Sequence, residues 1–200
     1  VVEDVAQAIG ACIENQMVGS FGDFSVFSFH AQKNMTTLGE GGMLIARDLN
    51  VSEVVPKVRH NGHCDFDELR EDYWIPAMGN VDLPSLNGEA IWPNNFCLGE
   101  IQCALGAMLL DRIEEINRLK RKRALKFIDS CGPYPQLEFH RESSTRHNYH
   151  LLVGKFNDGS RDHFIRTMAK EHGIQCIVQY YPLYRYDFYK KLGFGEANCP

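Results

Sequence analysis

Lys33 lies in a loop between two predicted strands, and its type and place suit covalent chemistry. Residues 24–29 alternate bulky and small side chains, and residues 43–46 form an apolar run directly after the glycine-rich cluster 39–42. Alternation and short apolar runs bounded by glycine predict strands. A lysine in such a loop is usually a solvated surface charge. A lysine held away from water can instead react as a free amine with an aldehyde.

Three further polar residues would complete a site for an aldehyde cofactor, pyridoxal phosphate. This cofactor needs hydrogen-bond donors for its phosphate and an acid partner for its ring nitrogen. Ser28, five positions before Lys33, is a candidate phosphate donor. Asp4 follows an apolar pair that predicts a short buried strand, so it would lie at the carboxyl edge of a sheet, where open α/β sheets bind ligands. From three residues further on, Gln7 would reach the phenolic oxygen of the ring.

Several stretches of this sequence closely resemble the DegT/StrS-type sugar aminotransferases. The most specific stretch is residues 33–42, Lys-Asn-Met-Thr-Thr-Leu-Gly-Glu-Gly-Gly. The other similar stretches are residues 3–11, 19–29, 59–62, 95–106 and 173–183. These aminotransferases are pyridoxal-phosphate enzymes of the aspartate aminotransferase fold, known as fold type I. The resemblance therefore implies an α/β fold in which part of a large domain, with a mixed or parallel sheet, precedes a small α+β domain.

The resemblance implies a role for five residues. Lys33 would form the Schiff base with pyridoxal phosphate and shuttle protons, and Asp4 would be the partner of the ring nitrogen. Gln7 would contact the ring, and Ser28 would bind the phosphate. Asn95 would reach the phosphate bound by a neighbouring subunit, which implies a homodimer with shared active sites. The alternative for Asn95 is that it only caps the helix that follows.

The sequence departs from the family pattern at four positions. Cys97 stands in place of the usual arginine and Pro93 in place of the usual glycine, while Gln179 and Tyr184 stand where the family often has histidine. The last two positions lie near the substrate in the family, so they bear on which sugar is bound. The family's amino-terminal portion, with its glycine-rich phosphate loop, and the end of its small domain are absent. We therefore expect this chain to be a fragment.

A long helical pattern divides the chain. Apolar residues recur at helical spacing, with charges between them and no proline, which predicts one helix over 98–130. We expect this helix to bridge two domains: residues 1–97 as the carboxyl-terminal part of the large cofactor-binding domain, and residues 131–200 as an incomplete small domain. Residues 62–95 are rich in glycine, proline, asparagine and aspartate, which predicts long irregular connections.

Local signals predict three elements in the small domain. Residues 151–153 form an apolar run typical of a strand. Ser160 is a candidate N-cap for an amphipathic helix over 161–172, which Gly173 would end. Residues 174–178 then predict another strand.

Composition excludes several classes of protein. A net charge of −5, from 21 basic and 26 acidic residues, argues against nucleic acid as the main partner. No apolar run is long enough for a membrane span, and the first residues lack the pattern of a signal peptide. Seven cysteines without a C-x-x-C pair fit reduced thiols. We therefore expect a cytoplasmic protein.

Two clusters have ordinary structural explanations. His60, His63 and Cys64 are close in sequence, but no fourth ligand has convincing spacing, so we expect no metal site. The basic run at residues 118–123 would spread its charges around a helix, which favours a solvated face over a nucleic-acid site.

The sequence as a whole predicts an aminotransferase. It would convert the keto group of a nucleotide-linked deoxysugar into an amine, with nitrogen from an amino acid, typically glutamate, for a polysaccharide or a secondary metabolite. Two alternatives keep the fold. One is a dehydratase of similar sugars, whose known members carry histidine at the lysine position, and the other is a non-catalytic binding module. The presence of Lys33 favours the aminotransferase.

Overall fold

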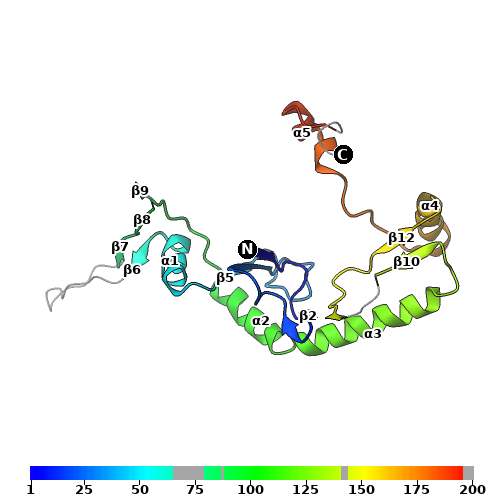
Figure 1. Ribbon diagram of the computed structural model, residues 1–200, viewed down its shortest axis with the longest axis horizontal. Helices are drawn as coiled ribbons and strands as arrows, with labels where there is room; N and C mark the ends of the chain where they lie inside the picture. Colours follow the sequence, from blue (N-terminus) through cyan, green and yellow to red (C-terminus); the bar gives the residue numbers. More distant parts are fainter. Residues whose placement is uncertain (65–78, 87, 141–143, 196–200) are drawn as a thin grey trace. The chain divides into compact units, whose positions relative to one another are not determined.

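The computed structural model of the chain (Figure 1) describes residues 1–64, 79–86, 88–140 and 144–195. The chain divides into two packed units. The first unit comprises Val1–Pro133 and Phe139–Val153, and the second comprises Tyr134–Glu138 and Gly154–Pro200. These units are defined by packing within this chain, so the domain division that we expect from the sequence stays a prediction. In the described part of the chain, no helix is both long and apolar enough to cross a membrane.

A three-stranded sheet carries the predicted site. It consists of β1 (Val2–Asp4), β4 (Phe24–Ser28) and β5 (Gly42–Ala46), in the order β1-β4-β5. Strand β1 pairs with β4 in parallel, and β4 pairs with β5 antiparallel. The strands predicted at the start of the chain, over 24–29 and over 43–46 are therefore confirmed.

The expected burial of the first strand is wrong for this chain. Val2 in β1 is 65% exposed, and Val26 in β4 is 42% exposed. Among the described residues β1 is an edge strand that pairs with β4 alone. Side chains of a strand are buried only where other elements pack on the faces of the sheet, and the exposure of Val2 and Val26 shows that such cover is incomplete there.

A small second sheet joins two distant segments of the first unit. It is formed by β2 (Cys12–Ile13), β3 (Gln16–Met17) and β11 (Thr145–Arg146), in the order β11-β2-β3. The two residues between β2 and β3, Glu14 and Asn15, have φ angles of 48° and 68°. Two successive positive φ angles are typical of the tight hairpin turn that matches strand twist.

Helices α1 (Leu49–Arg59), α2 (Glu100–Leu110) and α3 (Ile113–Cys131) complete the first unit. The prediction of one helix over 98–130 is wrong, because the chain breaks at Asp111 and Arg112 between α2 and α3. No glycine or proline marks the break, so helical spacing continues across it. Ile113, the first residue of α3, is buried in the core, so the start of α3 is fixed by packing.

The core of the first unit lies beneath the loop that carries Lys33. Its buried members are Phe29, Met35 and Ile113. The partly buried residues packed against them are Ile9, Phe27 and Leu109. The loop therefore has core residues on both sides of Lys33 in sequence.

The predicted irregular stretch 62–95 contains short strand pairs where it is described. β6 (His63–Cys64) pairs with β7 (Asn80–Val81), and β8 (Ser85–Leu86) pairs with β9 (Glu89–Ala90). Residues 65–78 and residue 87 lie outside the described part of the chain.

The second unit contains α4 (Arg161–His172), a 3-10 turn η1 (Leu183–Arg185) and α5 (Asp187–Lys191). Strands β10 (Leu137–Phe139) and β12 (Gly154–Phe156) form a two-stranded sheet. Helix α4 confirms the predicted helix over 161–172.

The two ends of α4 differ in how well they follow the sequence signals. Gly173 ends the helix with a φ of 64°, the left-handed conformation expected of a glycine C-cap. Ser160 occupies the N-cap position, but its side chain makes no capping hydrogen bond. The capping role predicted for Ser160 is therefore wrong, because its backbone is already helical there (φ −75°, ψ −1°), whereas a capping residue needs an extended one.

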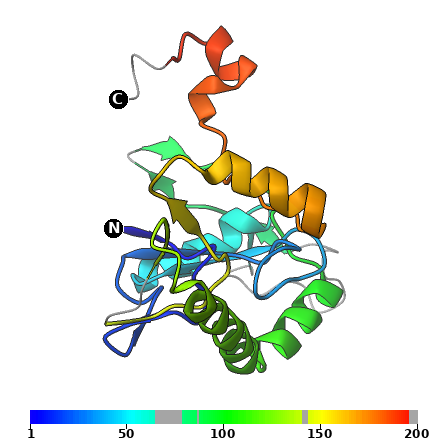
Figure 2. The same ribbon diagram turned by 90° about the vertical axis from the view of Figure 1, so that its right-hand side faces the viewer.

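Both strands predicted in the small domain are misplaced. The strand expected at 151–153 begins only at Gly154, as β12. Residues 174–178 form no strand, and in Figure 2 the chain after α4 (orange) runs as coil toward α5 (red). Apolar content favours a strand there, but no described strand pairs with this segment, and strands need a partner for their backbone hydrogen bonds.

Candidate active site

The loop between β4 and β5 is held by backbone hydrogen bonds at both ends. The amide of Phe29 donates to the carbonyl of Gly41 at 2.7 Å, and the amide of Ala31 donates to the carbonyl of Gly39 at 2.7 Å. Inside the loop, the amide of Lys33 donates to the carbonyl of His30 at 2.9 Å. The backbone that carries Lys33 is thus fixed on each side.

Lys33 is half-buried between anchored residues. The side chains of Asn34, Met35 and Thr37 are buried, with Thr37 only 1% exposed. Within the described residues, the side-chain amine of Lys33 makes no hydrogen bond or ion pair. An anchored backbone with an uncommitted amine is the arrangement that a lysine nucleophile needs.

Gly41 and Gly42 allow the glycine-rich turn to lie close to this loop. A Cβ at Gly41 would lie 2.2 Å from Thr37 Oγ1, and a Cβ at Gly42 would lie 2.7 Å from the carbonyl oxygen of Phe27. A side chain at Gly41 would push the turn away from the loop, and a side chain at Gly42 would push β5 away from β4. This close approach explains why glycine, rather than a generic turn residue, follows Glu40.

Asp4 and Ser28 lie at the same edge of the sheet. Each is the last residue of its strand, β1 or β4, and the two strands run in parallel. The carboxylate of Asp4 accepts a hydrogen bond from the amide of Ala6 at 3.0 Å, and the hydroxyl of Ser28 accepts one from the amide of His30 at 3.4 Å. Gln7 follows in the turn after β1. The edge therefore offers a carboxylate, a hydroxyl and an amide, as expected from the sequence.

Positive charge surrounds His150 near this edge. Burial lowers the pKa of His150 below its usual value, and the charges of Lys33 and Lys120 lower it further. Burial also lowers the pKa of the Lys120 amine. The lowered pKa favours the neutral form of His150, and the side chains of Lys33 and Lys120 lie close enough to act on it. Such an environment favours an anionic ligand such as a phosphate.

Asn95 lies in an extended segment between α1 and α2. Its neighbours are held by the last turn of α1, since the amide of Asn94 donates to Val58 and the amide of Phe96 donates to Arg59, each at 2.8 Å. The alternative role for Asn95 as a helix cap is wrong, because Gly99 occupies the N-cap of α2. The side chain of Asn95 is exposed and has no contact with the other four predicted site residues in the described structure. Its role across a subunit interface stays a prediction.

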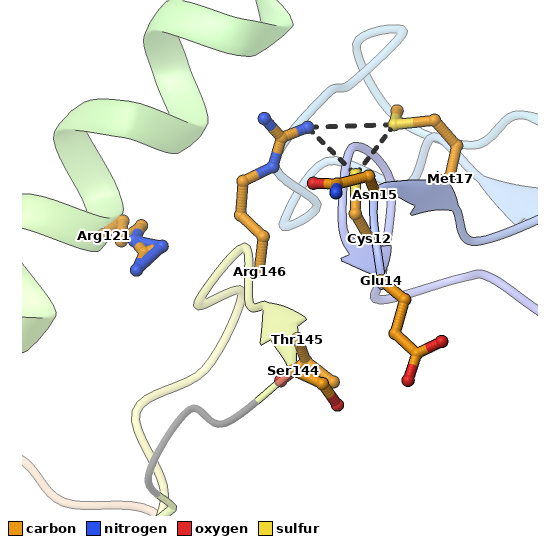
Figure 3. Close-up of a pocket in the computed structure, with 8 residues that line it drawn as sticks. All are labelled: Cys12, Glu14, Asn15, Met17, Arg121, Ser144, Thr145 and Arg146. Atoms are coloured by element: carbon orange, nitrogen blue, oxygen red, sulfur yellow. Dashed lines mark hydrogen bonds between the residues drawn. The ribbon is translucent and has the colours of Figure 1, made fainter.

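A separate cavity of about 630 Å³ lies away from the predicted residues (Figure 3). It is lined by residues of β2, the hairpin turn, β3, α3 and the β11 region. In Figure 3, Arg146 reaches toward Cys12 and Met17, and its guanidinium donates to Cys12 Sγ at 3.0 Å. Arg146 therefore links the β11 wall of the cavity to the β2 wall.

The structure also describes the histidine–cysteine group at residues 60–64 and the basic run at residues 118–123. Among the described residues, no group of three His, Cys, Asp or Glu side chains is arranged to hold a metal, and the rings of His60 and His63 pack edge to face at 4.8 Å. In the basic run, Arg118 pairs with Glu115 at 2.7 Å on the exposed face of α3. Two residues of the run depart from the predicted solvated face. Lys120 is half-buried and contacts Asn34, and Arg121 is half-buried and lines the cavity.

The comparison with protein families identifies the family of this chain. The sequence profile described as the DegT/DnrJ/EryC1/StrS aminotransferase family matches residues 1–200. The chain belongs to this family. The resemblance read from the residues around Lys33 is thereby confirmed.

Relatives of this chain in the DegT/DnrJ/EryC1/StrS family include enzymes named for the transamination of nucleotide-linked sugars. The chain is 29% identical to UDP-4-amino-4,6-dideoxy-N-acetyl-beta-L-altrosamine transaminase of Helicobacter pylori, over 96% of this chain and 47% of that protein. It is 28% identical to GDP-perosamine synthase of Vibrio cholerae, over 98% of this chain and 49% of that protein. The chain therefore spans about half the length of these relatives.

The fold of the DegT/DnrJ/EryC1/StrS member described here matches solved structures. A Streptococcus pneumoniae protein described as a sugar aminotransferase was solved in a PLP form, with 27% identity and a TM-score of 0.72, and in a PMP form, with 26% identity and a TM-score of 0.77. Each match covers 98% of this chain and about 48–49% of the other. The expected α/β fold of type I is confirmed, and these neighbours indicate pyridoxal phosphate as the cofactor of the family.

One group of residues beside Lys33 was not predicted from the sequence of this DegT/DnrJ/EryC1/StrS family member. Asn117 and Lys120 of α3 contact Asn34, as does the segment at Asn148 and His150. These contacts join residues 83 to 116 positions apart, so no local motif reveals them. The helical spacing of residues in α3 did indicate that part of this group faces the core. Buried Ile113 and Ala124 share a helical face with Asn117 and Lys120, at intervals of four, three and four residues.

Proposed function

We propose that this protein is a pyridoxal-phosphate-dependent aminotransferase that acts on a nucleotide-linked keto-deoxysugar. The observation that carries the proposal is Lys33, with its uncommitted amine on an anchored loop next to the sheet edge of Asp4 and Ser28. Membership of the family and the names of its relatives support the same activity.

The residues present fit pyridoxal phosphate by their donor set. Lys33, Asp4, Gln7 and Ser28 offer an amine, a carboxylate, an amide and a hydroxyl. In the described structure, neither the amine of Lys33 nor the side-chain amide of Gln7 makes a hydrogen bond to another residue. When bound, pyridoxal phosphate supplies an electron sink for the carbon atom that exchanges its proton.

Each side chain would have one task in the reaction. The amine of Lys33 would hold the cofactor and carry a proton between the two carbon atoms involved. The carboxylate of Asp4 would keep a proton on the ring nitrogen, because a negative charge beside it favours the protonated form. The hydroxyl of Ser28 would donate to a phosphate oxygen, and the amide of Gln7 would donate to the phenolic oxygen.

The substrate proposal depends on the relatives. One is named for a UDP-linked sugar and another for a GDP-linked sugar, which supports a nucleotide-linked keto-sugar as acceptor. We take an amino acid, glutamate, as the nitrogen donor, and the product as an amino sugar for a polysaccharide or a secondary metabolite.

Assembly and location belong to the same proposal. We take the active form as a homodimer in which Asn95 of one subunit contacts the phosphate bound by the other. We also take the protein to be cytoplasmic. The six cysteines in the described residues are all free, which supports a reducing compartment.

Reductive trapping tests the proposed function. The complete protein is loaded with pyridoxal phosphate, reduced with borohydride and mapped by mass spectrometry of its peptides. We expect the cofactor on Lys33, and we expect Lys33→Ala to carry no label and no transaminase activity. Lys122→Ala, at an exposed position on α3, is the matched control and should be labelled as the wild type is. Label on another lysine would overturn the proposal.

A further inference from the structure

The carboxamide of Asn34, the residue next to Lys33, makes hydrogen bonds through both its nitrogen and its oxygen. Its Nδ2 donates to Asn117 Oδ1 at 2.9 Å and to the carbonyl of Asn148 at 3.2 Å. Its Oδ1 accepts from Lys120 Nζ at 2.7 Å and lies 3.3 Å from His150 Nδ1. A carboxamide has two donor hydrogens and two acceptor lone pairs. Both hydrogens and one lone pair of this buried group are therefore used, and His150 Nδ1 lies within reach of the other lone pair.

A second layer of amides connects Asn34 to the turn after Asp4. Asn117 Nδ2 donates to the carbonyl of Ile9 at 2.9 Å. Asn148 Nδ2 donates to the carbonyls of Gln7 at 2.9 Å and Ile9 at 3.1 Å. We call Asn34, Asn117 and Asn148 the amide cluster. It joins the loop of Lys33 to the segment that carries Gln7 and begins at Asp4.

Two backbone positions next to the amide cluster, Gly10 and Tyr149, have positive φ angles. Gly10 has a φ of 76°, and a Cβ there would lie 2.4 Å from Asn117 Nδ2, so only glycine lets the turn approach α3. Tyr149 has a φ of 46°, which is unfavourable for a bulky residue and persists only where neighbouring contacts over-determine the conformation. Those contacts include Asn148 Oδ1, which accepts from the amide of His150 at 3.3 Å.

An amide at position 34 is required by the pattern of donors and acceptors. Asn117 Oδ1 and the carbonyl of Asn148 are both acceptors, so the group facing them must donate twice. Lys120 Nζ is a donor, so the other atom must accept. Aspartate would satisfy Lys120 but would place a carboxylate oxygen against two acceptors, which leaves them unpaired and repels them.

We propose that Asn34 is a positioning residue, which through the amide cluster fixes Lys33 relative to the Asp4–Gln7 segment. The inference rests on the proposed function, in which Lys33 and Asp4 act on the same cofactor. Asn34 itself would contact neither the reacting atoms nor the cofactor. Its effect is geometric, because a lysine displaced by about 1 Å can cost on the order of 100-fold in rate.

Hydrogen exchange in the cofactor-free protein tests the coupling directly. The comparison is between the wild type, Asn34→Asp and the control Ser25→Ala. Ser25 is also buried, at 2% exposed, and its hydroxyl donates to the carbonyl of Gly19 at 2.8 Å in the same unit. We expect Asn34→Asp to speed exchange of the Lys33 amide and of the Ala11 amide together. Ser25→Ala should leave both amides protected.

Kinetics of the loaded complete protein gives the second measurement. Asn34→Asp should lower kcat by about tenfold or more while the KM for the sugar changes by less than about threefold, because the substrate site stays in place. If Asn34→Asp does not fold, Asn117→Ala removes the link to Ile9 from the outer layer and should produce the same pair of effects, more weakly.

Two results would overturn the inference. One is faster exchange at the Lys33 amide of Asn34→Asp without any change at the Ala11 amide. The other is an unchanged kcat in Asn34→Asp protein that is shown to be folded. Both concern the amide cluster alone. Failure of the proposed function would be seen separately, as wild-type protein that borohydride does not label at Lys33.

Discussion

At the scale of single residues, the candidate site combines a fixed backbone with side chains that a ligand can reach. Lys33 and Asp4 have half-buried or exposed side chains, whereas Asn34 beside Lys33 and Val5 beside Asp4 are buried. Each functional group is therefore held by its neighbour in sequence. This arrangement leaves the amine and the carboxylate available for a ligand without leaving their positions undefined.

Asp4→Asn is expected to separate binding from turnover. The amide keeps the size of the side chain, so the complete protein should still bind pyridoxal phosphate and label on Lys33. It cannot hold the ring nitrogen protonated, so kcat should fall by roughly 100-fold to 1000-fold. Steady-state kinetics with glutamate and a nucleotide keto-sugar measure the effect. Turnover close to that of the wild type would show that Asp4 does not face the ring nitrogen.

At the scale of elements, loops and strands hold one another by polar groups as much as by apolar packing. Glu3 in β1 accepts hydrogen bonds from the amides of Gly19 at 2.8 Å and of Phe21 and Gly22 at 2.6 Å. Helix α2 approaches the Lys33 loop at Gly106, where a Cβ would lie 3.2 Å from Thr37 Cγ2. The elements around the site are thus fixed by contacts that depend on particular residues.

Glu3→Gln is expected to change how stability depends on pH. Hydrogen bonds from Gly22, and then from Gly19 and Phe21, lower the pKa of Glu3 below its usual 4.5, although desolvation opposes them. A lowered carboxylate pKa contributes stability above the unfolded value of about 4.5, and that stability is lost as pH falls through the folded value. Urea unfolding should therefore show the variant less stable than the wild type at pH 7, with a smaller difference near pH 3. A difference that does not change with pH would contradict this role for Glu3.

At the scale of the whole molecule, the site as proposed needs a second subunit. Asp4 and Ser28 lie at one sheet edge and Lys33 lies in the loop that follows Ser28, but Asn95 lies in another segment, beside the last turn of α1. The chain also spans about half the length of its named relatives. A shared site in a homodimer accounts for an exposed Asn95 that caps no helix.

Mixing two inactive variants tests the shared site. Lys33→Ala subunits are combined with Asn95→Ala subunits of the complete protein under conditions that exchange subunits. If Asn95 acts across the interface, each hybrid dimer has one site with both changes and one intact site. An equal mixture should then recover roughly a quarter of wild-type activity, because about half of random dimers are hybrids. No recovery, with hybrids demonstrated by mass spectrometry, would exclude this role of Asn95.

The sequence by itself determined the family, the cofactor of that family and the elements with strong local signals. The run from Lys33 to Gly42 indicates the family, and the types of Asp4, Gln7 and Ser28 indicate the cofactor. Alternation predicts β4, and amphipathic spacing with a closing glycine predicts α4. These features follow from residue types within about ten positions, where backbone preference and side-chain period act directly.

Only the tertiary structure decided what depends on distant partners. The break between α2 and α3 follows from the burial of Ile113, and residues 174–178 form no strand because no described strand pairs with them. Lys120 changes from a solvated charge to a partner of Asn34 because the two residues, 86 positions apart, are brought together. The physical reason is that burial and hydrogen-bond partners are properties of the packed chain, and a local pattern specifies only which groups are available to form them.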